Sequence, residues 1–544
     1  MYAATTIRMS CLILVGVMFA LTSLAVMPDP TLIGPRMEPV NLADYKQVCY
    51  VSADTGDDEQ GNGTREKPWK SVVHALDSIS SASEANPAAV LVAEGLYDQN
   101  TVVMKAYVSL LGGYAKDTWE RAIDQHKSVL SGAEVRRVVV GADNARLDGF
   151  YITDGRSLGH GAGILCEDVS PTISNNVITG NWTLEPPNFN HHRIHQPGYD
   201  GGGIACLFNA CPAIHNNLIA DNGTGVGNGA GISFHGRAYP TATAVAEFRH
   251  NIVVNNVSGR SDGNQTRSSS GGGISCAHET SPKIEENIIV GNQSLGLSDT
   301  GGIYCEYAAS PAISGNWIVG NRGADDGGGI YIMRVSEPTI ENNIVAGNAS
   351  RGVGGIRISK EGRALINSNL IARNLSGGGV LVRDGYVSLA KNLIVDNQGG
   401  VGFEYRQDYP YFVAPSLEGD VIWGNEQPGI PVIGKAAKPP IVRNCVVEGG
   451  CEGEGNSAAD PHLVKDGGTG MVSSLSYSAE THTTTLKGQI PDCAAAGRVL
   501  FLGNQASVVK SRDGNTVTVW GRLTQDQEGR PVGTFDIMST YGFR

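Results

Sequence analysis

The sequence contains no long run of Lys or Arg, and its 54 acidic residues outnumber its 41 Lys and Arg residues. The formal net charge of −13, together with the missing basic runs, excludes a general nucleic-acid binder. Beyond residue 27 the chain has no second long apolar stretch, and the spacings of its cysteines match no zinc motif. These absences leave an acidic protein without a recognisable zinc site.

Glycine is abundant, with 72 residues among 544, about twice the usual share. Hydrophobic residues make up 41% of the chain, which is enough for a large core and excludes wholesale disorder. Many glycines in an ordered chain indicate many tight turns, as in a β architecture with repeated corners.

The N-terminus resembles an export signal. One positive charge, Arg8, precedes the apolar run at residues 11–27, which contains the small-residue pattern Ser23-Leu24-Ala25 near its end. We expect residues 1–25 to be a signal peptide cleaved after Ala25, although an uncleaved membrane anchor is the alternative. Cleavage would give a secreted or cell-surface protein with no remaining membrane segment.

The strongest signal is an internal repeat, in which Asn precedes an apolar triplet and a second Asn follows five positions later. The first Asn of each unit is Asn176, Asn217, Asn251, Asn287, Asn316, Asn343, Asn369 or Asn392. Asp420 and Asn444 continue a weakened form, and Gly149 begins an earlier one. The spacing is in the twenties with insertions, which indicates one coil of a repeat fold per unit.

A second element shares this register: a Gly-rich turn leads into a short alternating strand, as in GGGIAC (201–206) and GGGIYI (327–332). Strands of three to five residues cannot bury a face alone, so neighbouring coils must stack into long parallel sheets. Parallel crossovers are nearly always right-handed. The pattern predicts an all-β, right-handed parallel β-helix.

Strand alternation assigns the side chains, because Ile and Cys of G-I-x-C point inward and the middle residue points outward. One internal position is therefore shared by Cys166, Cys206, Cys276 and Cys305. A metal or redox stack is one interpretation, and a column of small buried hydrophobes is the favoured one. The two Asn columns predict amide ladders between coils.

These features resemble the right-handed parallel β-helix, pectate-lyase-like superfamily of secreted bacterial proteins. The segment at 50–76 is similar to one that opens many such proteins, through Tyr50-Val51-Ser52, Gly63-Thr64, Pro68-Trp69 and Ala75. The resemblance implies a helix at Ser71–Ser80 that caps the open end, and an apolar stripe at helical spacing agrees. We expect the cap and first irregular coils at 26–134 and the repeats at 135–464.

Residues 465–544 follow a different pattern of β-type runs, including an expected hairpin at Lys510–Thr516 around an Asp-Gly turn. They predict a small C-terminal β module. A glycan or cell-surface role is one interpretation, and simple capping of the coils is the more conservative one.

One candidate site lies along the outward row, where Tyr304, Tyr331 and Arg357 would offer aromatic faces beside a cation to a sugar or an acidic polysaccharide. The turn after these strands carries further polar residues, among them His278. A lyase of this superfamily commonly uses Arg or Lys as base and often calcium, so Arg334, Lys360 and Glu306 are the catalytic candidates. The alternative is a charged surface that keeps a long sheet soluble.

A second candidate is the longest insertion, at 182–203, which carries His191, His192 and His195. Three His residues within five positions could bind a metal or supply a base, although a solvated loop is the alternative. No metal ligand set can be assigned, and calcium is the one candidate cofactor.

Two functional hypotheses follow. The first is a secreted protein that interacts with polysaccharide or a cell-surface glycan, as a polysaccharide lyase or glycoside hydrolase if it is an enzyme. The second is a non-catalytic surface or structural β-helix that displays binding loops, since fold does not determine function. In both cases we expect a monomer.

Overall fold

The computed structural model describes residues 30–185, 199–237, 245–259, 269–295, 300–405, 413–434, 439–524, 533–539 and 541–543. The predicted signal peptide therefore lies outside the described residues. The described chain divides into two compact units. The N-terminal unit contains Leu32–Asn287 and Ser294–Ser298, and the C-terminal unit contains Ile288–Gln293 and Asp299–Arg544.

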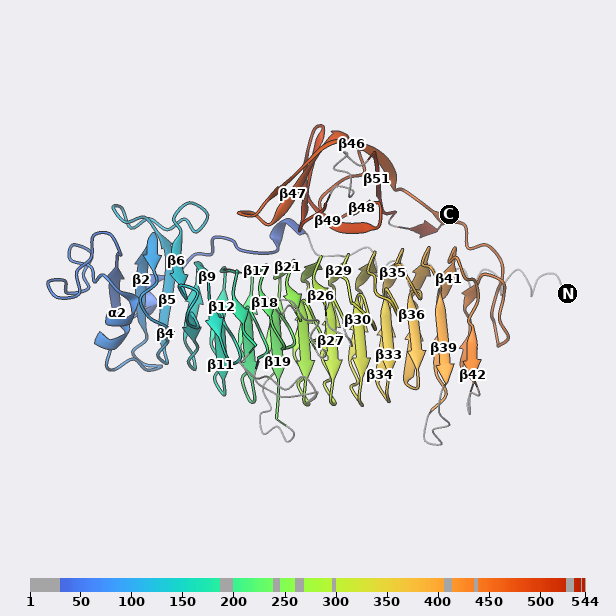
Figure 1. Cartoon of the computed structure of the whole chain (residues 1–544), viewed down its shortest axis with the longest axis horizontal. Coiled ribbons are helices and arrows are strands. Elements are labelled where there is room, and N and C mark those ends of the chain that lie inside the picture. The colour runs from blue at the N-terminus through green and yellow to red at the C-terminus, as the bar shows by residue number, and fades with distance from the viewer. Residues whose placement is uncertain are drawn as a thin grey trace. The chain divides into compact units, whose positions relative to one another are not determined.

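The N-terminal unit is a stack of parallel strands in which each coil contributes one strand to each of three sheets (Figure 1). Its first sheet contains β1 (Gln47–Val51), β2 (Ala88–Ala93), β5 (Val108–Tyr114), β8 (Arg146–Asp148), β12 (Thr172–Ser174), β16 (Ala213–His215), β20 (Glu247–Arg249) and β24 (Lys283–Glu285). The second contains β3 (Gly95–Tyr97), β6 (Ser128–Ser131), β9 (Phe150–Thr153), β13 (Val177–Thr179), β17 (Leu218–Ala220) and β21 (Ile252–Val254). The third contains β4 (Val102–Val103), β7 (Val139–Val140), β11 (Ile164–Glu167), β15 (Ile204–Leu207), β19 (Ile232–His235) and β23 (Ile274–Ala277). Short strands β10 (Arg156–Ser157), β14 (Trp182–Thr183), β18 (Gly223–Thr224) and β22 (Val257–Ser258) form an additional narrow sheet.

The C-terminal unit repeats the same three-sheet plan. Its first sheet contains β28 (Ala312–Ser314), β31 (Thr339–Glu341), β34 (Arg363–Asn367), β37 (Tyr386–Ala390), β40 (Ser416–Glu418) and β43 (Ile441–Arg443). The second contains β25 (Ile288–Val290), β29 (Trp317–Val319), β32 (Ile344–Ala346), β35 (Leu370–Ala372), β38 (Leu393–Val395), β41 (Val421–Trp423) and β44 (Val446–Val447). The third contains β27 (Ile303–Glu306), β30 (Ile330–Met333), β33 (Ile356–Ser359), β36 (Val380–Arg383), β39 (Val401–Tyr405) and β42 (Val432–Gly434).

The first coil carries the one α-helix of the described residues, α2 (Val72–Ser78), close to the expected range. Ser71 is its N-cap, and the helix buries Val72, Ala75 and Leu76 against β1, β2 and β4. The helix therefore covers the first strands of the N-terminal unit, where an open sheet edge would otherwise be exposed.

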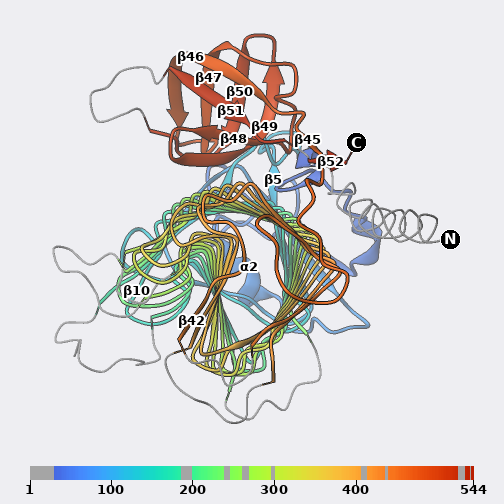
Figure 2. The ribbon, with the colours of Figure 1, turned by 90° about the vertical axis from the view of Figure 1, so that its right-hand side faces the viewer.

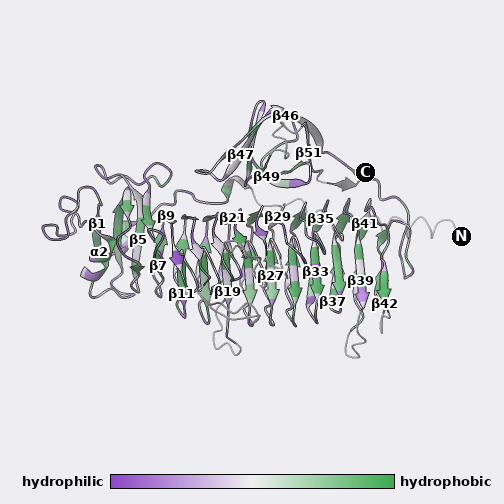
Figure 3. Cartoon of the chain, in the orientation of Figure 1, coloured by the Kyte–Doolittle hydropathy of each residue, from purple (hydrophilic) through white to green (hydrophobic). Residues whose placement is uncertain are grey.

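The inward positions of the third sheet are those that the sequence predicts. The thiols of Cys166, Cys276 and Cys305 are fully buried, and Cys206 is 3% exposed. All nine cysteines in the described residues are free, and burial raises the pKa of Cys206 well above its ordinary value. The column therefore behaves as buried hydrophobic side chains, and most of the strand residues of the coils are hydrophobic, with hydrophilic ones between them (Figure 3).

The predicted amide ladders are confirmed. In the C-terminal unit the backbone N–H and the side-chain Nδ2 of Asn343 both donate to Asn369 Oδ1, at 2.9 and 3.0 Å. Asn369 repeats the pattern toward Asn392, and Asn392 toward Asp420. Equivalent bonds link Asn176, Asn217, Asn251 and Asn287 in the N-terminal unit.

The sequence prediction is wrong by one residue at the two ends of the ladder, where it assigned Gly149 and Asn444 to the ladder position. Val421 pairs with Val446, so Cys445 and not Asn444 takes the ladder position after Asp420. Tyr151 pairs with Val177, so Phe150 and not Gly149 takes the position before Asn176. In both cases the ladder of side-chain amides ends, because Phe150 and Cys445 carry no side-chain amide.

The C-terminal β module is a closed antiparallel barrel (Figure 2). Its strand order is β46 (Gly468–Ser478), β47 (Thr483–Gln489), β50 (Thr516–Trp520), β49 (Gln505–Asp513), β48 (Val499–Leu502) and β51 (Thr534–Ile537). The predicted hairpin is present, since Asp513 pairs with Thr516 across a turn. A pair of short strands, β45 (Leu463–Val464) and β52 (Gly542–Phe543), lies next to the barrel in the sequence.

The barrel packs on the outer side of the second sheet of its own unit. Trp317 Nε1 donates to the carbonyl oxygen of Gly497 at 3.0 Å, and the Arg373 guanidinium lies 3.9 Å from the centre of the Phe501 ring. A side chain at Gly347 would clash with Phe501 and Ala506. The expectation that this module simply caps the coils is therefore wrong, because the barrel covers an apolar flank.

Candidate functional site

Six of the predicted site residues lie together on the outer face of the third sheet in the C-terminal unit. They belong to three consecutive coils: Tyr304 and Glu306 on β27, Tyr331 on β30 with Arg334 after it, and Arg357 on β33 with Lys360 after it. Tyr304 pairs with Tyr331 and Tyr331 with Arg357 in the sheet register. We call this group the third-sheet cluster.

The turns that follow these strands place Arg334 and Lys360 in one column. Both residues have left-handed backbone angles, with φ of 54° and 48°, and the Arg334 N–H donates to the Lys360 carbonyl oxygen at 2.9 Å. Tyr307 occupies the same position one coil earlier, with φ of 51°. Identical turns stacked at the strand spacing bring the side chains of neighbouring coils side by side.

Arg334 is held between an aromatic ring and a carboxylate. Its Nη1 lies 3.1 Å from Glu306 Oε2 and also bonds the Tyr307 hydroxyl, and the guanidinium lies 4.5 Å from the Tyr307 ring centre. Glu306 accepts a further hydrogen bond, 2.9 Å long, from the Tyr304 hydroxyl. The Glu306 side chain is 4% exposed, whereas that of Arg334 is 28% exposed. Glu306 is therefore a buried carboxylate that holds the Arg334 guanidinium in place, and Arg334 is partly exposed at the surface.

The predicted open aromatic platform is not present. Tyr304, Tyr331 and Arg357 leave the outer face of the sheet, but they are 4%, 1% and 4% exposed. The Tyr331 hydroxyl bonds Ser359 Oγ at 2.8 Å. Burial, followed by the charge of Glu306, raises the pKa of Tyr304 well above its ordinary value. Rings packed in this way offer no free face for stacking on a sugar, so the exposed-platform prediction is corrected.

Arg357 is covered by a neighbouring turn. Its Nη1 lies 2.9 Å from Asp326 Oδ1 and also donates to the Asp326 carbonyl oxygen, and there is no room for a side chain at Gly352 beside it. Asp326 was missed as a partner in the sequence, because it lies in the turn before β30 and 31 residues from Arg357. The acidic pair Asp325-Asp326 beside a Gly-rich turn was the available signal.

Lys360 is the exposed member of the cluster. Partial burial first, and then the charge of Arg334, lower the pKa of Lys360 below its ordinary value. Among the described residues Lys360 has no ion-pair partner, whereas Arg334 pairs with Glu306 and Arg357 with Asp326. As an ammonium beside the partly exposed guanidinium of Arg334, Lys360 can bind an anion, and its lowered pKa makes it lose its proton more readily than an ordinary lysine, so more of it is the free amine that can act as a base.

His278 lies elsewhere, in the N-terminal unit. Its ring centre is 4.4 Å from that of His235, and His235 Nδ1 is 3.2 Å from Asp200 Oδ2. Burial alone would raise the pKa of Asp200, but the hydrogen bond and charge of His235 hold it below its ordinary value. Asp200 also receives the Asn228 N–H at 2.7 Å, so this network joins neighbouring coils. His191, His192 and His195 lie outside the described residues.

The described residues contain no group of three or more His, Cys, Asp or Glu side chains placed to hold a metal ion. In that same part of the chain, no helix has the length and apolar character needed to cross a membrane.

Two family models match the sequence. The model described as a right handed beta helix region matches residues 241–354 and 327–460. The model of a protein of unknown function, DUF1565, matches residues 54–266. No curated protein matches the sequence significantly.

Solved structures resemble the chain at low identity. The tailspike gp61 of Pseudomonas phage phi297 is 9% identical with a TM-score of 0.24, and the match covers 83% of this chain and 66% of the tailspike. An endo-xylogalacturonan hydrolase from Aspergillus tubingensis is 15% identical with a TM-score of 0.15, and the match covers 76% of this chain and 92% of the hydrolase. At these TM-scores neither likeness supports an argument about function.

Proposed function

The chain is a right-handed parallel β-helix protein, and from this premise we propose that it is exported and interacts with an anionic polysaccharide through the third-sheet cluster. One observation carries the proposal: Lys360 stays exposed and without an ion-pair partner among the described residues, in register with Arg334. Two stacked cations one coil apart can contact successive carboxylates or a single one from two sides.

The charge of the whole chain makes this local arrangement necessary. A formal net charge of −13 repels an acidic glycan, so binding requires a local positive surface or a bridging cation such as calcium. The binding should weaken as salt is raised, because the cations concerned are exposed.

The alternative function is a non-catalytic surface β-helix that displays binding loops. Its support is the packing of Glu306, Tyr304 and Arg357, which are engaged with other protein groups and buried. This leaves Lys360 and Arg334 as the groups of the cluster that a ligand could contact directly. A measurement of polysaccharide turnover distinguishes binding alone from catalysis by these two residues.

The experiment is a panel of acidic and neutral polysaccharides tested with purified residues 26–544, with and without calcium. Binding is measured together with unsaturated products and reducing ends. Lys360→Ala is compared with Lys391→Ala, an exposed lysine that also follows a strand of the same unit with a left-handed backbone, φ of 56°. Loss of binding to an acidic glycan in the first variant alone supports the proposal.

Lys360→Arg separates binding from catalysis. Arginine keeps the positive charge but loses its proton far less readily than a lysine of lowered pKa, so it can bind an anion and should be the poorer base at this position. Retained binding with lost turnover would make Lys360 the base of a lyase. Binding without turnover in the native protein would establish a non-catalytic glycan binder. Absence of binding to every glycan would contradict the proposal and favour a rod that displays loops.

A further inference from the structure

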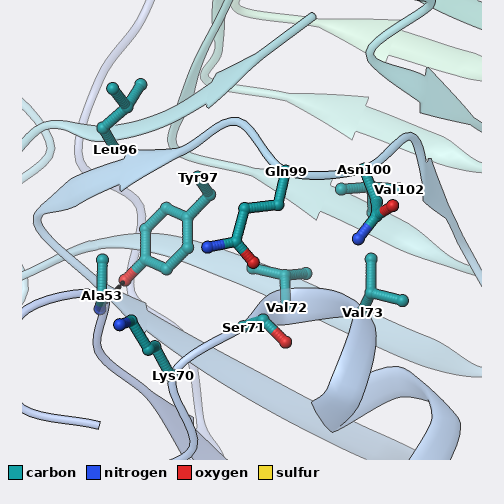
Figure 4. A pocket seen from close by; sticks show the side chains of 10 residues that line it. All are labelled: Ala53, Lys70, Ser71, Val72, Val73, Leu96, Tyr97, Gln99, Asn100 and Val102. Carbon is teal, nitrogen blue, oxygen red and sulfur yellow. Dashed lines mark hydrogen bonds between the residues drawn. The ribbon is translucent and has the colours of Figure 1, made fainter. Parts of the chain in front are cut away.

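A separate pocket lies at the start of the N-terminal unit, between α2 and the connection from β3 to β4 (Figure 4). One wall is the ring of Tyr97, and Val72 and Val102 supply apolar surface next to it. The carboxamides of Gln99 and Asn100 lie on the rim, and Leu96 beside them is 57% exposed. An apolar surface next to convergent polar groups is the usual composition of a small-molecule site.

The Tyr97 ring is held rigidly. Its hydroxyl accepts a hydrogen bond from the Ala53 N–H at 3.1 Å and donates to the Ala93 carbonyl oxygen at 3.1 Å. Burial raises the pKa of this hydroxyl. Because the oxygen is already engaged, Tyr97 presents its ring to the pocket and not its hydroxyl.

The backbone N–H groups just before α2 are already bound to a carboxylate. Asp58 Oδ1 accepts the N–H groups of Lys70 and Ser71 at 2.8 and 3.0 Å, and Ser71 Oγ accepts the His74 N–H at 3.2 Å. The charge of Lys70 acts on Asp57, whose pKa is lowered by the N–H groups of Gln60 and Glu59 and, less, by Lys70. The one cation that lines the pocket, Lys70, therefore has the Asp57 carboxylate near it, and the N–H groups of Lys70 and Ser71 are already bound to Asp58, which disfavours an anionic ligand.

The rim supplies neutral hydrogen-bonding groups. The side chains of Gln99 and Asn100 are exposed and form no hydrogen bond with any of the described residues. Each carboxamide can donate and accept at once, which matches a hydroxyl. The cavity measures about 80 Å³, which admits part of one ring and not an extended chain.

From these contacts we propose that this pocket binds one neutral sugar ring. The apolar face of a pyranose packs on Tyr97 and the neighbouring valines, and its hydroxyls bond the carboxamides of Gln99 and Asn100. The proposal is independent of the third-sheet cluster, because it concerns a neutral ligand and another part of the fold.

The test is saturation-transfer NMR on the full mature chain with methyl glucoside, methyl galactoside and methyl mannoside, and with glucuronate as the charged comparison. The expected result is transfer to at least one neutral glycoside and weaker transfer to glucuronate. The double variant Gln99→Ala/Asn100→Ala should weaken binding about tenfold, as expected for two lost hydrogen bonds. Gln125→Ala, an exposed carboxamide outside the pocket, is the matched control and should change nothing.

Lys360→Ala separates this proposal from the function proposed for the cluster, because binding of the neutral glycoside should survive it. Transfer that is lost with Lys360→Ala but not with Gln99→Ala/Asn100→Ala would assign the ligand to the cluster and overturn the pocket. Absence of transfer to every neutral glycoside, or stronger transfer to glucuronate, would overturn it as well. Equal melting temperatures of the variants would show that each remains folded.

Discussion

Arg334 Nη1 lies 3.1 Å from Glu306 Oε2, a carboxylate on the preceding coil that is almost fully buried. Arg334→Ala should therefore lower the free energy of unfolding by about 2–3 kcal/mol, because it leaves the buried Glu306 carboxylate without its counter-ion. The double variant Arg334→Ala/Glu306→Gln should recover most of the lost stability, because glutamine carries no charge at position 306. Urea unfolding measures both free energies.

The control for this pair is Arg383→Ala, which removes a partner of Glu404 in a pair whose two side chains are 23% and 25% exposed. Solvent screens this pair, so the loss should stay below about 1 kcal/mol. Equal losses for Arg334→Ala and Arg383→Ala would contradict the buried role of Glu306.

Lys360 should react faster than Lys391 with an acylating reagent near pH 9. Partial burial and the charge of Arg334 lower the pKa of Lys360, so a larger fraction of it is the nucleophilic free amine. We expect a several-fold faster modification, measured by mass spectrometry of digests after short exposure. Slower modification of Lys360 than of Lys391 would speak against the lowered pKa.

Asn369→Ala should be strongly destabilising. Asn369 is fully buried, accepts from Asn343 and donates to the Ile340 carbonyl oxygen at 2.8 Å and to Asn392. Its loss leaves buried backbone groups unpaired, with an expected decrease of about 3–5 kcal/mol in the free energy of unfolding. Asn367→Ala, at a half-buried surface position on β34, is the control. A ladder without energetic importance would give similar unfolding curves for the two variants.

Asp420→Asn should stabilise the protein in a pH-dependent manner. Asp420 takes a ladder position, its Oδ1 accepts two bonds from Asn392, and its buried Oδ2 has no partner. Burial raises the pKa of Asp420 to about 7. The folded protein holds this proton after the unfolded chain has lost it, so stability decreases as the pH rises from about 4 to 7.

The gain from Asp420→Asn should therefore be close to zero below about pH 4 and reach about 4 kcal/mol at most above pH 7. Thermal or urea unfolding at pH 4, 6 and 8 measures this trend. A gain that is constant across this range, or that is largest at low pH, would be inconsistent with a raised pKa.

Removal of residues 465–544 should expose apolar surface on the second sheet. Trp317 is 1% exposed and bonds the barrel through the Gly497 carbonyl oxygen. We expect increased binding of an apolar fluorescent dye and a lower melting temperature, because buried aromatic area becomes exposed. Unchanged dye binding and melting would mean that the barrel contributes little to covering this flank.

The coil, its register and the ladders can be predicted from the amino-acid sequence without the structure. Each of these follows from local repetition: in every unit two apolar residues of the strand, Ile or Val followed by Cys or another apolar residue, point inward, and Asn recurs at the same bend, so one coil predicts the next. The prediction failed by one residue only at Gly149 and Asn444, where an apolar residue replaces the ladder amide.

A further feature of the sequence indicates that the second sheet is covered on its outer face. Triplets such as Ile288–Val290 are apolar at every position, which is typical of a parallel strand covered on both faces. That pattern indicated that something lies on the second sheet, but it could not identify the barrel as that covering.

Which of the outward side chains are exposed to solvent depends on the packing of the folded chain. Tyr331 and Arg357 share one outward position of the repeat and are buried, whereas Lys360, in the turn after β33, is exposed. The difference arises because the turn at Asp326 covers Arg357. The position of that turn depends on how neighbouring coils pack against each other. Periodicity gives the face on which a side chain lies, whereas its exposure depends on chain segments that are distant in sequence.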